Sequence, residues 1–463
     1  MTMFDSARPG ARLVAFFLRR SWVLMGPCAL GGCTSASPPA EEAAAELGGA
    51  VEAEGAERGA GELIAHEWGT FTSMQGSQGT ILDGLHHESE RLPAFVHSNL
   101  GASQVSPFVS YGDQSLGAPV HRVNSKMETP VIYFYTKTRR RVSVNVDFTS
   151  GLLTQWYPRA AQAPDSTGAR VGNPGSASPG RAPTGVIDVS GIERSSLGWE
   201  LDLTPFGEAA PAGIPAVEAH DPWQYAREVR AAYVVSHGAK GPEADHYVFY
   251  RGLGRMTPTI DVQALANGFV VVRNTGAQAI TGAFVLEMGA SSGRFQKIVD
   301  LGAGASRPVA LGQAPVADRE RVVAELSAEV QKSLVAQGLF EDEAIAMVRT
   351  WAPTWFASEG TRVISFVPRQ VTDAVLPLRI TPVPDALVRV LVARHEYLTP
   401  ETEADVVGAL RDRMSSEPTK RDAAMRRLGR LGRFLEPAVR RAVTSSGDAV
   451  VKQSATELLG SYR

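Results

Sequence analysis

Residues 142–148 alternate between apolar and polar side chains, and this pattern limits the segment to a half-buried β-strand. The segment reads VSVNVDF, so every second side chain is apolar. A period of two places the apolar side chains on one face of a strand and the polar ones on the other. The apolar run Val131–Tyr135 precedes it, and the residues between the two runs are polar and basic. We therefore predict that the two runs form an antiparallel hairpin.

Short runs of strand-forming residues continue to about residue 301, between turns rich in Gly and Pro. They lie at Gly185–Val189, Leu197–Leu203, Val229–Val235, Tyr247–Tyr250, Phe269–Arg273, Ile280–Met288 and Phe295–Leu301. Many short strands joined by turns are typical of a β-sandwich. We predict a β-sandwich-like, antiparallel β-rich domain over residues 63–314, with a low-complexity loop at 160–184.

The spacing of apolar residues changes after residue 315. Apolar side chains recur every three or four positions from Val322 to Leu334, and Gly338 follows as a stop, so we predict an amphipathic helix. A second helix is predicted at 342–351, and strand-like runs follow at 362–367 and 387–392. Residues 315–398 are therefore a mixed α/β segment, and the expected fold class of the body is α+β.

The C-terminal residues 399–463 have the pattern of helices. Thr399 is a predicted N-cap with Pro400 at the first helical position. The segment from Ala423 onwards resembles a HEAT-type helical repeat and covers about one and a half repeats, whereas about three are needed for a free-standing array. We expect a small HEAT-like helical appendage that packs on the preceding domain.

Composition narrows the class of partner and the type of site. The chain has 463 residues and a net charge of −3, which does not provide the basic face that binding to nucleic acid needs. Its two cysteines, Cys28 and Cys33, lie near the N-terminus, so the body has neither a disulfide framework nor a thiolate metal site. No stretch of the body approaches the ~18 apolar residues that span a bilayer.

The N-terminus has the pattern of an export signal over residues 1–32. Four arginines precede a short apolar stretch, and small residues follow it. The ending Leu30-Gly31-Gly32-Cys33 resembles the lipobox of bacterial lipoproteins. That resemblance implies lipid on Cys33, an exported protein and a membrane anchor in the cell envelope. The alternatives are an ordinary signal peptide cut after Ala36 and a twin-arginine signal at Arg19-Arg20.

Residues 33–62 are strongly acidic and have no aromatic side chain. From residue 34 onwards they contain seven glutamates and one arginine. Such a segment buries too little apolar surface to offset its ordering entropy. We predict a disordered acidic tether between the anchor and the body.

A histidine-rich region opens the body and is the main candidate for chemistry. His66 and Glu67 are followed within about twenty residues by His86, His87 and Glu88. Imidazole and carboxylate groups together suit zinc, iron or manganese. The spacing does not form the helical two-histidine zinc motif, because position 70 is a threonine. The alternative is that His66 and Glu67 are buried in a strand and bonded to backbone, with His86 and His87 on a solvated loop.

Three other strings are interpreted as structural. Residues 289–293 (GASSG) match the nucleophile-elbow pattern, but strand-like runs flank them on both sides, which predicts a hairpin turn. Asp245 and His246 are adjacent on a strand and would point to opposite faces. The aromatic group Trp351, Trp355 and Phe356 has core spacing, although it could form a sugar-binding platform. No phosphate-cradling or dinucleotide-binding loop is present, so no cofactor of these kinds is implied.

The body also resembles an uncharacterised family of exported bacterial proteins. The strings that carry the resemblance are His66–Thr72, Glu128–Tyr135, Gln155–Pro158, Tyr250–Gly254 and Glu359–Pro368. It implies no activity, so the sequence does not decide whether the protein is an enzyme. The first hypothesis is a non-catalytic envelope protein that binds a protein or a glycan. The alternative is a metal-dependent hydrolase with His66, Glu67, His86 and His87 as ligands.

Overall fold

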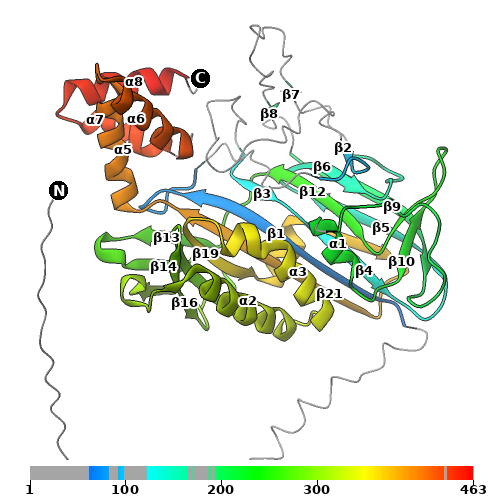
Figure 1. Cartoon of the computed structure of the whole chain (residues 1–463). Helices are drawn as coiled ribbons and strands as arrows, with labels where there is room; N and C mark the ends of the chain where they lie inside the picture. The colour runs from blue at the N-terminus through cyan, green and yellow to red at the C-terminus, as the bar shows by residue number, and fades with distance from the viewer. Residues whose placement is uncertain are drawn as a thin grey trace, which may run out of the picture. The chain divides into compact units, whose positions relative to one another are not determined.

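The computed structural model describes residues 62–82, 92–98, 123–164, 170–171, 187–188, 193–219, 221–431 and 435–461. The predicted signal peptide, Cys33 and the acidic segment as far as residue 61 lie outside these ranges. So do His86, His87 and most of the predicted loop at 160–184. The fold class is α+β, as the sequence predicts: large antiparallel sheets carry most of the body and helices follow at the C-terminus (Figure 1).

The largest sheet of the described residues has 11 strands. Its order is β18 (Ala317–Asp318), β16 (Ser292–Ile298), β15 (Ala283–Met288), β19 (Gly360–Val367), β21 (Ala386–Tyr397), β1 (Ile64–Gln75), β3 (Ser125–Met127), β12 (Val248–Gly254), β6 (Gly151–Tyr157) and β2 (His97–Ser98). The remaining strand, β4 (Val131–Tyr135), pairs with both β1 and β12. The long parallel pair of β1 and β21 lies in the middle of this sheet.

Three smaller sheets accompany it. One has the order β11 (Glu243–Asp245), β10 (Tyr233–Ser236), β9 (Ser195–Thr204), β5 (Arg140–Phe148) and β20 (Leu378–Thr381). The second contains β13 (Ile260–Ala264), β14 (Val270–Asn274) and β17 (Ser306–Val309), and the third pairs β7 (Arg170–Val171) with β8 (Ile187–Asp188).

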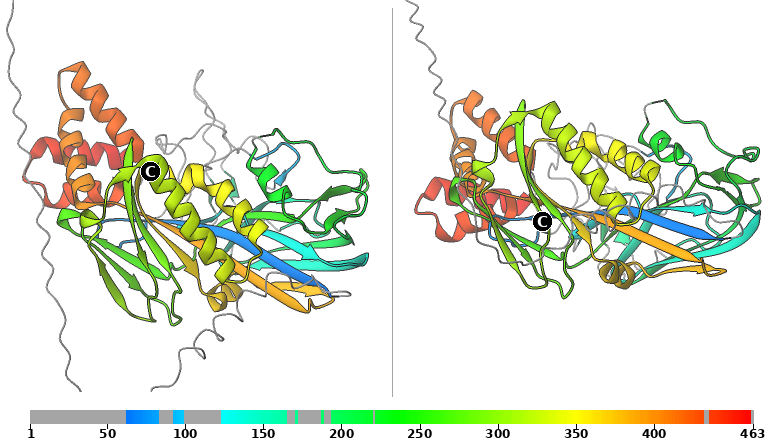
Figure 2. Two further views of the ribbon diagram at one scale, coloured as in Figure 1. Left: turned by 60° about the horizontal axis from the view of Figure 1, so that its bottom comes forward. Right: turned by 90° about the horizontal axis from the view of Figure 1, so that it is seen from below.

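Helices cover one face of the large sheet (Figure 2). They are α1 (Pro222–Arg227), α2 (Arg319–Ala336), α3 (Glu341–Trp351) and the π-helical turn η4 (Ala352–Phe356). The remaining elements are α4 (Arg369–Val375), the short turns η2 (Ala266–Gly268) and η3 (Leu311–Gln313), and the C-terminal α5 (Pro400–Arg413), α6 (Pro418–Leu431), α7 (Glu436–Ser445) and α8 (Ala449–Ser461). Among the residues placed by the structure, no helix is long and apolar enough to cross a membrane.

Alternation along the central strands separates the hydrophobic cores. In β15, Phe284 and Leu286 pack under the helices, whereas Ala283 and Val285 pack against the three-stranded sheet. Another part of the sheet face opposite the helices, which includes Phe71 of β1, packs on the five-stranded sheet. The body is therefore layered, with helices, the large sheet and then two smaller sheets.

The predicted hairpin between residues 131–135 and 142–148 is wrong, although both strands exist. β4 pairs with β1 and β12 in the large sheet, whereas β5 pairs with β9 and β20 in the five-stranded sheet. The two strands face each other across the core that contains Phe134 and Val144. The physical reason is burial: every residue of β4 is buried, so this strand needs a sheet that is covered on both faces.

The mixed α/β segment 315–398 contributes to the large sheet rather than forming a layer apart. β19 and β21 fill positions between β15 and β1. Its first helix, α2, buries Val322, Leu326 and Val330 as the apolar spacing predicts. Gly338 follows with a φ of 104°, a left-handed conformation that glycine adopts without strain.

The C-terminal helices pack on one another around a small core of their own. α5 begins as predicted: the Thr399 hydroxyl accepts a hydrogen bond from the Thr402 amide, and Pro400 occupies the first turn. The carboxylate of Glu403 accepts hydrogen bonds from the amide and hydroxyl of Ser77, just beyond β1.

A buried histidine makes stability depend on pH. His395 of β21 is 1% exposed, and its Nδ1 lies 2.7 Å from the Ser73 hydroxyl of β1. Burial lowers its pKa from 6.5 to about 4. The unfolded chain therefore binds a proton between these pKa values that the folded chain does not, and the folded state loses stability as the pH falls.

We expect the free energy of unfolding to fall by about 2 kcal/mol more between pH 7 and pH 5 in the wild type than in His395→Gln. Glutamine keeps a polar group beside Ser73 but does not titrate. Urea unfolding at both pH values measures the difference. Equal pH dependence in the two proteins would show that His395 is already accessible to protons.

Candidate functional site

The histidine-rich string lies on β1, where it is buried on both faces. Alternation places His66 on the helix-covered face, beside Trp68 two residues later, and Glu67 on the opposite face. The backbone of Pro130 approaches Gly69 so closely that a Cβ at position 69 would lie 2.8 Å from the Pro130 Cα. The string therefore fits one central strand, with each side chain directed to its own layer.

His66 connects β1 to the start of α3. Its Nδ1 lies 2.8 Å from an Oε2 of Glu343, and its ring stacks on Phe340 with centroids 4.5 Å apart. The same Oε2 accepts a hydrogen bond from the Phe340 amide at 2.7 Å. The hydroxyl of Tyr135 donates to the other oxygen, Oε1, at 2.8 Å. Four groups from β1, β4 and α3 thus form one buried polar cluster.

This cluster keeps the phenol of Tyr135 protonated. Burial, followed by the charge of Glu343, raises the pKa of Tyr135 well above its usual value of 10. The hydroxyl points inward to Glu343 and is a donor in this hydrogen bond. At neutral pH Tyr135 is therefore not available as a general base.

Glu67 forms a separate buried ion pair on the other face of β1. Its Oε2 accepts a hydrogen bond from the Arg389 Nε at 2.6 Å, and its Oε1 accepts one from the Tyr250 hydroxyl. Arg389 also donates to Asp373 at 2.8 Å. Burial alone would lower the pKa of Arg389, but the charge of Glu67, together with Tyr250 and the hydrogen bonds to Glu67 and Asp373, outweighs it and raises the pKa. Glu67 is thus bonded to β21 and β12.

The structure does not bring His66 and Glu67 together as ligands. They face opposite layers and bond to different partners. His86, His87 and Glu88 lie outside the described residues, so their part in a metal site stays a prediction. Within the ranges that the structure covers, no three His, Cys, Asp or Glu side chains are grouped to hold a metal ion.

The other strings have the structural roles that the sequence predicts. Residues 289–293 form the turn of the β15–β16 hairpin, with Met288 paired to Gly293. Trp355 is 1% exposed and lies in the helix-covered core, and its backbone oxygen accepts a hydrogen bond from Arg362 at 2.6 Å. The nucleophile-elbow match is therefore accidental, and the aromatic group is core.

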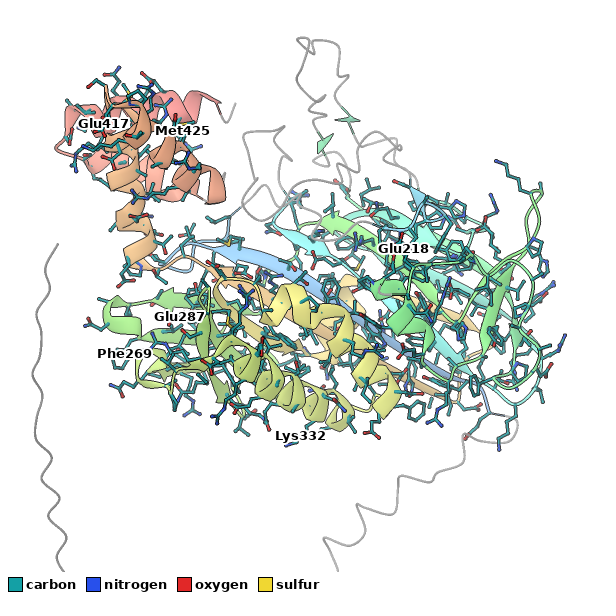
Figure 3. All side chains as sticks on the ribbon, viewed as in Figure 1. Glu218, Phe269, Glu287, Lys332, Glu417 and Met425 are labelled. Carbon is teal, nitrogen blue, oxygen red and sulfur yellow. The ribbon has the colours of Figure 1, made fainter. Side chains whose placement is uncertain are left out.

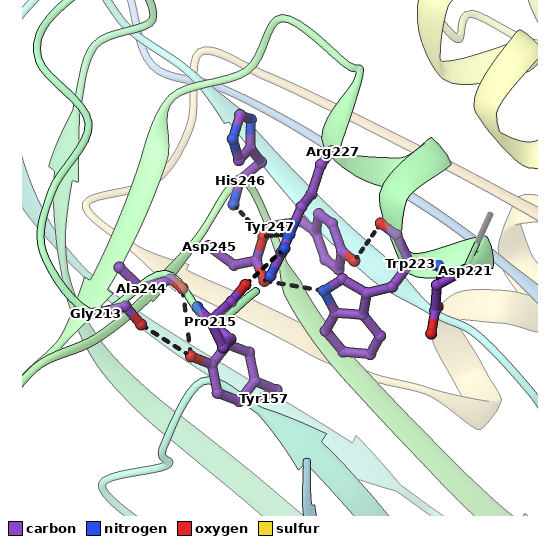
Figure 4. A network of polar contacts seen from close by, with 10 residues as sticks. All are labelled: Tyr157, Gly213, Pro215, Asp221, Trp223, Arg227, Ala244, Asp245, His246 and Tyr247. Atoms are coloured by element: carbon purple, nitrogen blue, oxygen red, sulfur yellow. Dashed lines mark hydrogen bonds and ion pairs between the residues drawn. The ribbon is translucent and has the colours of Figure 1, made fainter. Parts of the chain in front are cut away.

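Asp245 organises the contact between α1 and β11 (Figure 4). Its carboxylate accepts hydrogen bonds from the Trp223 indole at 3.0 Å and from Arg227 at 2.7 and 2.8 Å. It also accepts the backbone amide of His246 at 2.8 Å. The imidazole of His246 instead lies against Tyr233. Asp245 therefore orients Arg227 and Trp223 rather than a catalytic histidine.

A buried charge cluster lies at the other end of β1. Lys126 and Glu128 form an ion pair at 2.9 Å, and the Thr72 hydroxyl donates to Glu128 at 3.1 Å. Burial would raise the pKa of Glu128, but Lys126, Arg394 and Arg251 outweigh it and hold the pKa at about 2. Glu128 is thus ionised at all physiological pH values and acts as a structural counter-ion.

A pocket with a volume of about 450 Å³ opens beside the His66 cluster. It is lined by Ile64, residues 135–137, residues 205–208, Arg230 and Ala232. These residues come from the start of β1, the end of β4, the segment after β9 and the approach to β10. Volumes of this size suit small organic ligands.

The walls of the pocket are apolar and its rim is charged. Tyr135 is 3% exposed and forms part of the wall, whereas Phe206 is 52% exposed. Lys137, Glu208 and Arg230 are the ionisable side chains of the lining that reach solvent. The arrangement can hold an apolar body and fix a polar group at the rim.

Sequence reasoning missed this pocket for a physical reason. Its residues come from four segments that are far apart in the chain and form no motif. Lys137 lies in the polar connection after β4, which the sequence identifies only as a turn. The pocket opens where the end of β4, in the large sheet, lies near the segment after β9, in the five-stranded sheet, and this division into two sheets is not visible in the apolar pattern.

Comparisons with known proteins do not show a family for this chain. No family model matches the chain, and no curated protein matches it. Among solved structures, the chain is similar to the Mu homology domain of Fcho1 from Danio rerio, in a structure with a bound Eps15 peptide. The match has 5% identity and a TM-score of 0.26, and covers 74% of this chain and 99% of that domain. A similarity this low supports no conclusion about function.

Glu343 gives a direct test of the His66 cluster. We expect Glu343→Gln to lower the free energy of unfolding by about 1–3 kcal/mol, because the buried charge-assisted bonds to His66 and Tyr135 are lost. Glu341→Gln, an exposed position two residues before Glu343 on the same helix, should change stability by less than about 0.5 kcal/mol. Urea unfolding measures both. Equal effects would contradict the buried cluster.

Bound-metal analysis tests the metal hypothesis. Because His66 is bonded to Glu343, we expect the purified chain and its His66→Ala variant to have the same metal content. Elemental analysis of both proteins after dialysis gives the answer. A stoichiometric metal that the His66→Ala variant lacks would establish His66 as a ligand and favour the hydrolase.

Proposed function

We propose that this protein is an exported, lipid-anchored binding protein of the cell envelope. It holds a small organic ligand in the pocket between β4 and the segment after β9, and it performs no chemistry on that ligand. The observation that carries the proposal is the pocket itself: a cavity of about 450 Å³ whose wall residue Tyr135 directs its hydroxyl inward to Glu343.

The chemistry of the lining favours binding over catalysis. The Tyr135 hydroxyl is the lining group that most resembles a catalytic base, and burial and the charge of Glu343 keep it protonated. The carboxylate of Glu208 accepts hydrogen bonds from Arg139. The pocket thus offers shape, apolar surface and charge, which are the properties of a binding site.

The anchor is proposed from the N-terminal sequence. The lipobox-like ending places lipid on Cys33, and the acidic residues 34–62 provide a spacer between that lipid and the body. A binding protein held in this way would sample its ligand near the membrane surface. The HEAT-type resemblance of the C-terminal helices adds a surface on which a protein partner could dock.

The two cysteines provide a matched pair for testing the anchor. We expect Cys33→Ala to move the protein from the membrane fraction to the soluble fraction, because the acylated residue is removed. Cys28→Ala should leave it with the membranes. Mass spectrometry of the mature N-terminus should show acyl mass on Cys33. A free N-terminus near Ser37 would instead establish simple secretion.

Two exposed phenylalanines provide a matched pair for testing the pocket. We expect Phe206→Ala to weaken binding of the neutral fluorescent probe N-phenyl-1-naphthylamine by about fivefold to tenfold, because Phe206 forms part of the wall. Phe269→Ala, which removes a partly exposed ring from the β13–β14 connection, should leave binding unchanged. Fluorescence titration of the Cys33→Ala chain measures both affinities. Equal effects of the two substitutions would contradict the pocket as the site.

A further inference from the structure

The rim of the pocket carries more positive than negative charge. Lys137 and Arg230 line it, and Arg139 lies one step away, joined to the lining residue Glu208. Asp342 is the second carboxylate in this group, through its contacts with Arg230. Among the described residues, the charged lining and its ion-pair partners thus comprise three cations and two carboxylates.

Both carboxylates already accept hydrogen bonds from the protein. Glu208 accepts from the Nε and Nη2 atoms of Arg139 at 2.8 and 2.7 Å. Asp342 accepts from the backbone amide of Arg230 at 3.0 Å and from the amide of Glu343 at 3.2 Å. Arg139 offsets the charge of Glu208 and Arg230 that of Asp342, so with Lys137 the described charges of this group sum to one positive charge at the rim.

The interior of the pocket has the opposite character. Ile64, Pro205 and Ala232 provide aliphatic surface, and the rings of Tyr135 and Phe206 provide aromatic surface. A flat apolar body gains most by burying its faces against such walls. The distribution is therefore amphipathic, with apolar surface inside and cations at the opening.

We infer that the ligand of this pocket is a soluble organic anion with a flat apolar body, such as an aromatic carboxylate or sulfonate. The apolar body lies against Phe206 and Tyr135, and the anionic group lies at the rim beside Lys137 and Arg230. This inference rests on the proposed function, because it names the chemical class that the same pocket binds. A guanidinium and an ammonium are the usual partners of such groups.

Two fluorescent probes of similar shape separate the charge requirement from simple apolar binding. The anionic probe is 1-anilinonaphthalene-8-sulfonate, and the neutral one is N-phenyl-1-naphthylamine. The test variant is Lys137→Gln with Arg230→Gln, two exposed positions of the rim. The control is Lys332→Gln with Arg307→Gln, two exposed cations on α2 and β17 (Figure 3 labels Lys332).

We expect the rim variant to bind the anionic probe at least about tenfold more weakly and the neutral probe within about twofold of the wild type. The control pair should change neither affinity by more than about twofold. Raising the salt concentration should weaken the anionic probe alone.

Three results would overturn the inference. The anionic probe would bind the rim variant as tightly as the wild type, or both probes would lose affinity equally, or the control pair would weaken the anionic probe as much as the rim pair. None of these results concerns the dependence of the neutral probe on Phe206, so the proposed function would stand. Failure of Phe206→Ala to weaken either probe would instead overturn the proposed function and the inference with it.

Discussion

The buried ion pair of Glu67 and Arg389 joins the two strands on which the rest of the body depends. β1 and β21 pair in parallel along their whole length, from Ile64 opposite Ala386 to Gln75 opposite Tyr397. Glu67 and Arg389 are directly opposite each other in this register and are at most 1% exposed in their side chains. Removing one partner of such a pair leaves an uncompensated buried charge. The pair therefore specifies how β1, at the start of the body, aligns with β21, which lies more than 300 residues later in the chain.

That alignment determines where the other layers lie. With β1 and β21 in the centre, the strands of the large sheet between residues 97 and 254 add to the β1 side. Its strands between residues 283 and 367 add to the β21 side. Even-numbered residues of β1 such as His66 face the helices, and odd-numbered residues such as Glu67 face the smaller sheets. The histidine-rich string thus links layers: His66 bonds to α3, and Glu67 bonds to β21 and β12. The pocket opens where β1 begins and β4 ends.

Local patterns predict the elements but not their partners. Alternation at 142–148 predicts β5, the spacing from Val322 predicts α2, and Thr399 with Pro400 predicts the start of α5. These signals depend on residues within one or two turns of each other. The pairing of β4 with β1 rather than β5, and of β1 with β21, depends on contacts across more than 60 and 300 residues. No alternation within a strand encodes them, so the predicted hairpin was wrong.

The candidate site shows the same limit. The sequence singles out His66 and Glu67 because imidazole and carboxylate groups are rare in apolar strands, and the structure shows that both are buried beside specific partners. Their adjacency in the chain places them on opposite faces, which the sequence could have indicated once β1 was known to be a strand. Glu343 and Arg389, their partners, lie over 270 residues away. The pocket residues Lys137, Phe206 and Arg230 carry no local signal at all.

The central claim is that Glu67 serves the β1–β21 pair as a structural counter-ion, and a double-mutant cycle tests it most directly. Glu67→Gln, Arg389→Met and the double variant would be unfolded in urea. Each single substitution should cost about 3–5 kcal/mol, and the double variant should cost less than the sum by about 2 kcal/mol or more, because no charge is then left unpaired. Additive costs, or a Glu67→Gln variant as stable as the wild type, would contradict the account.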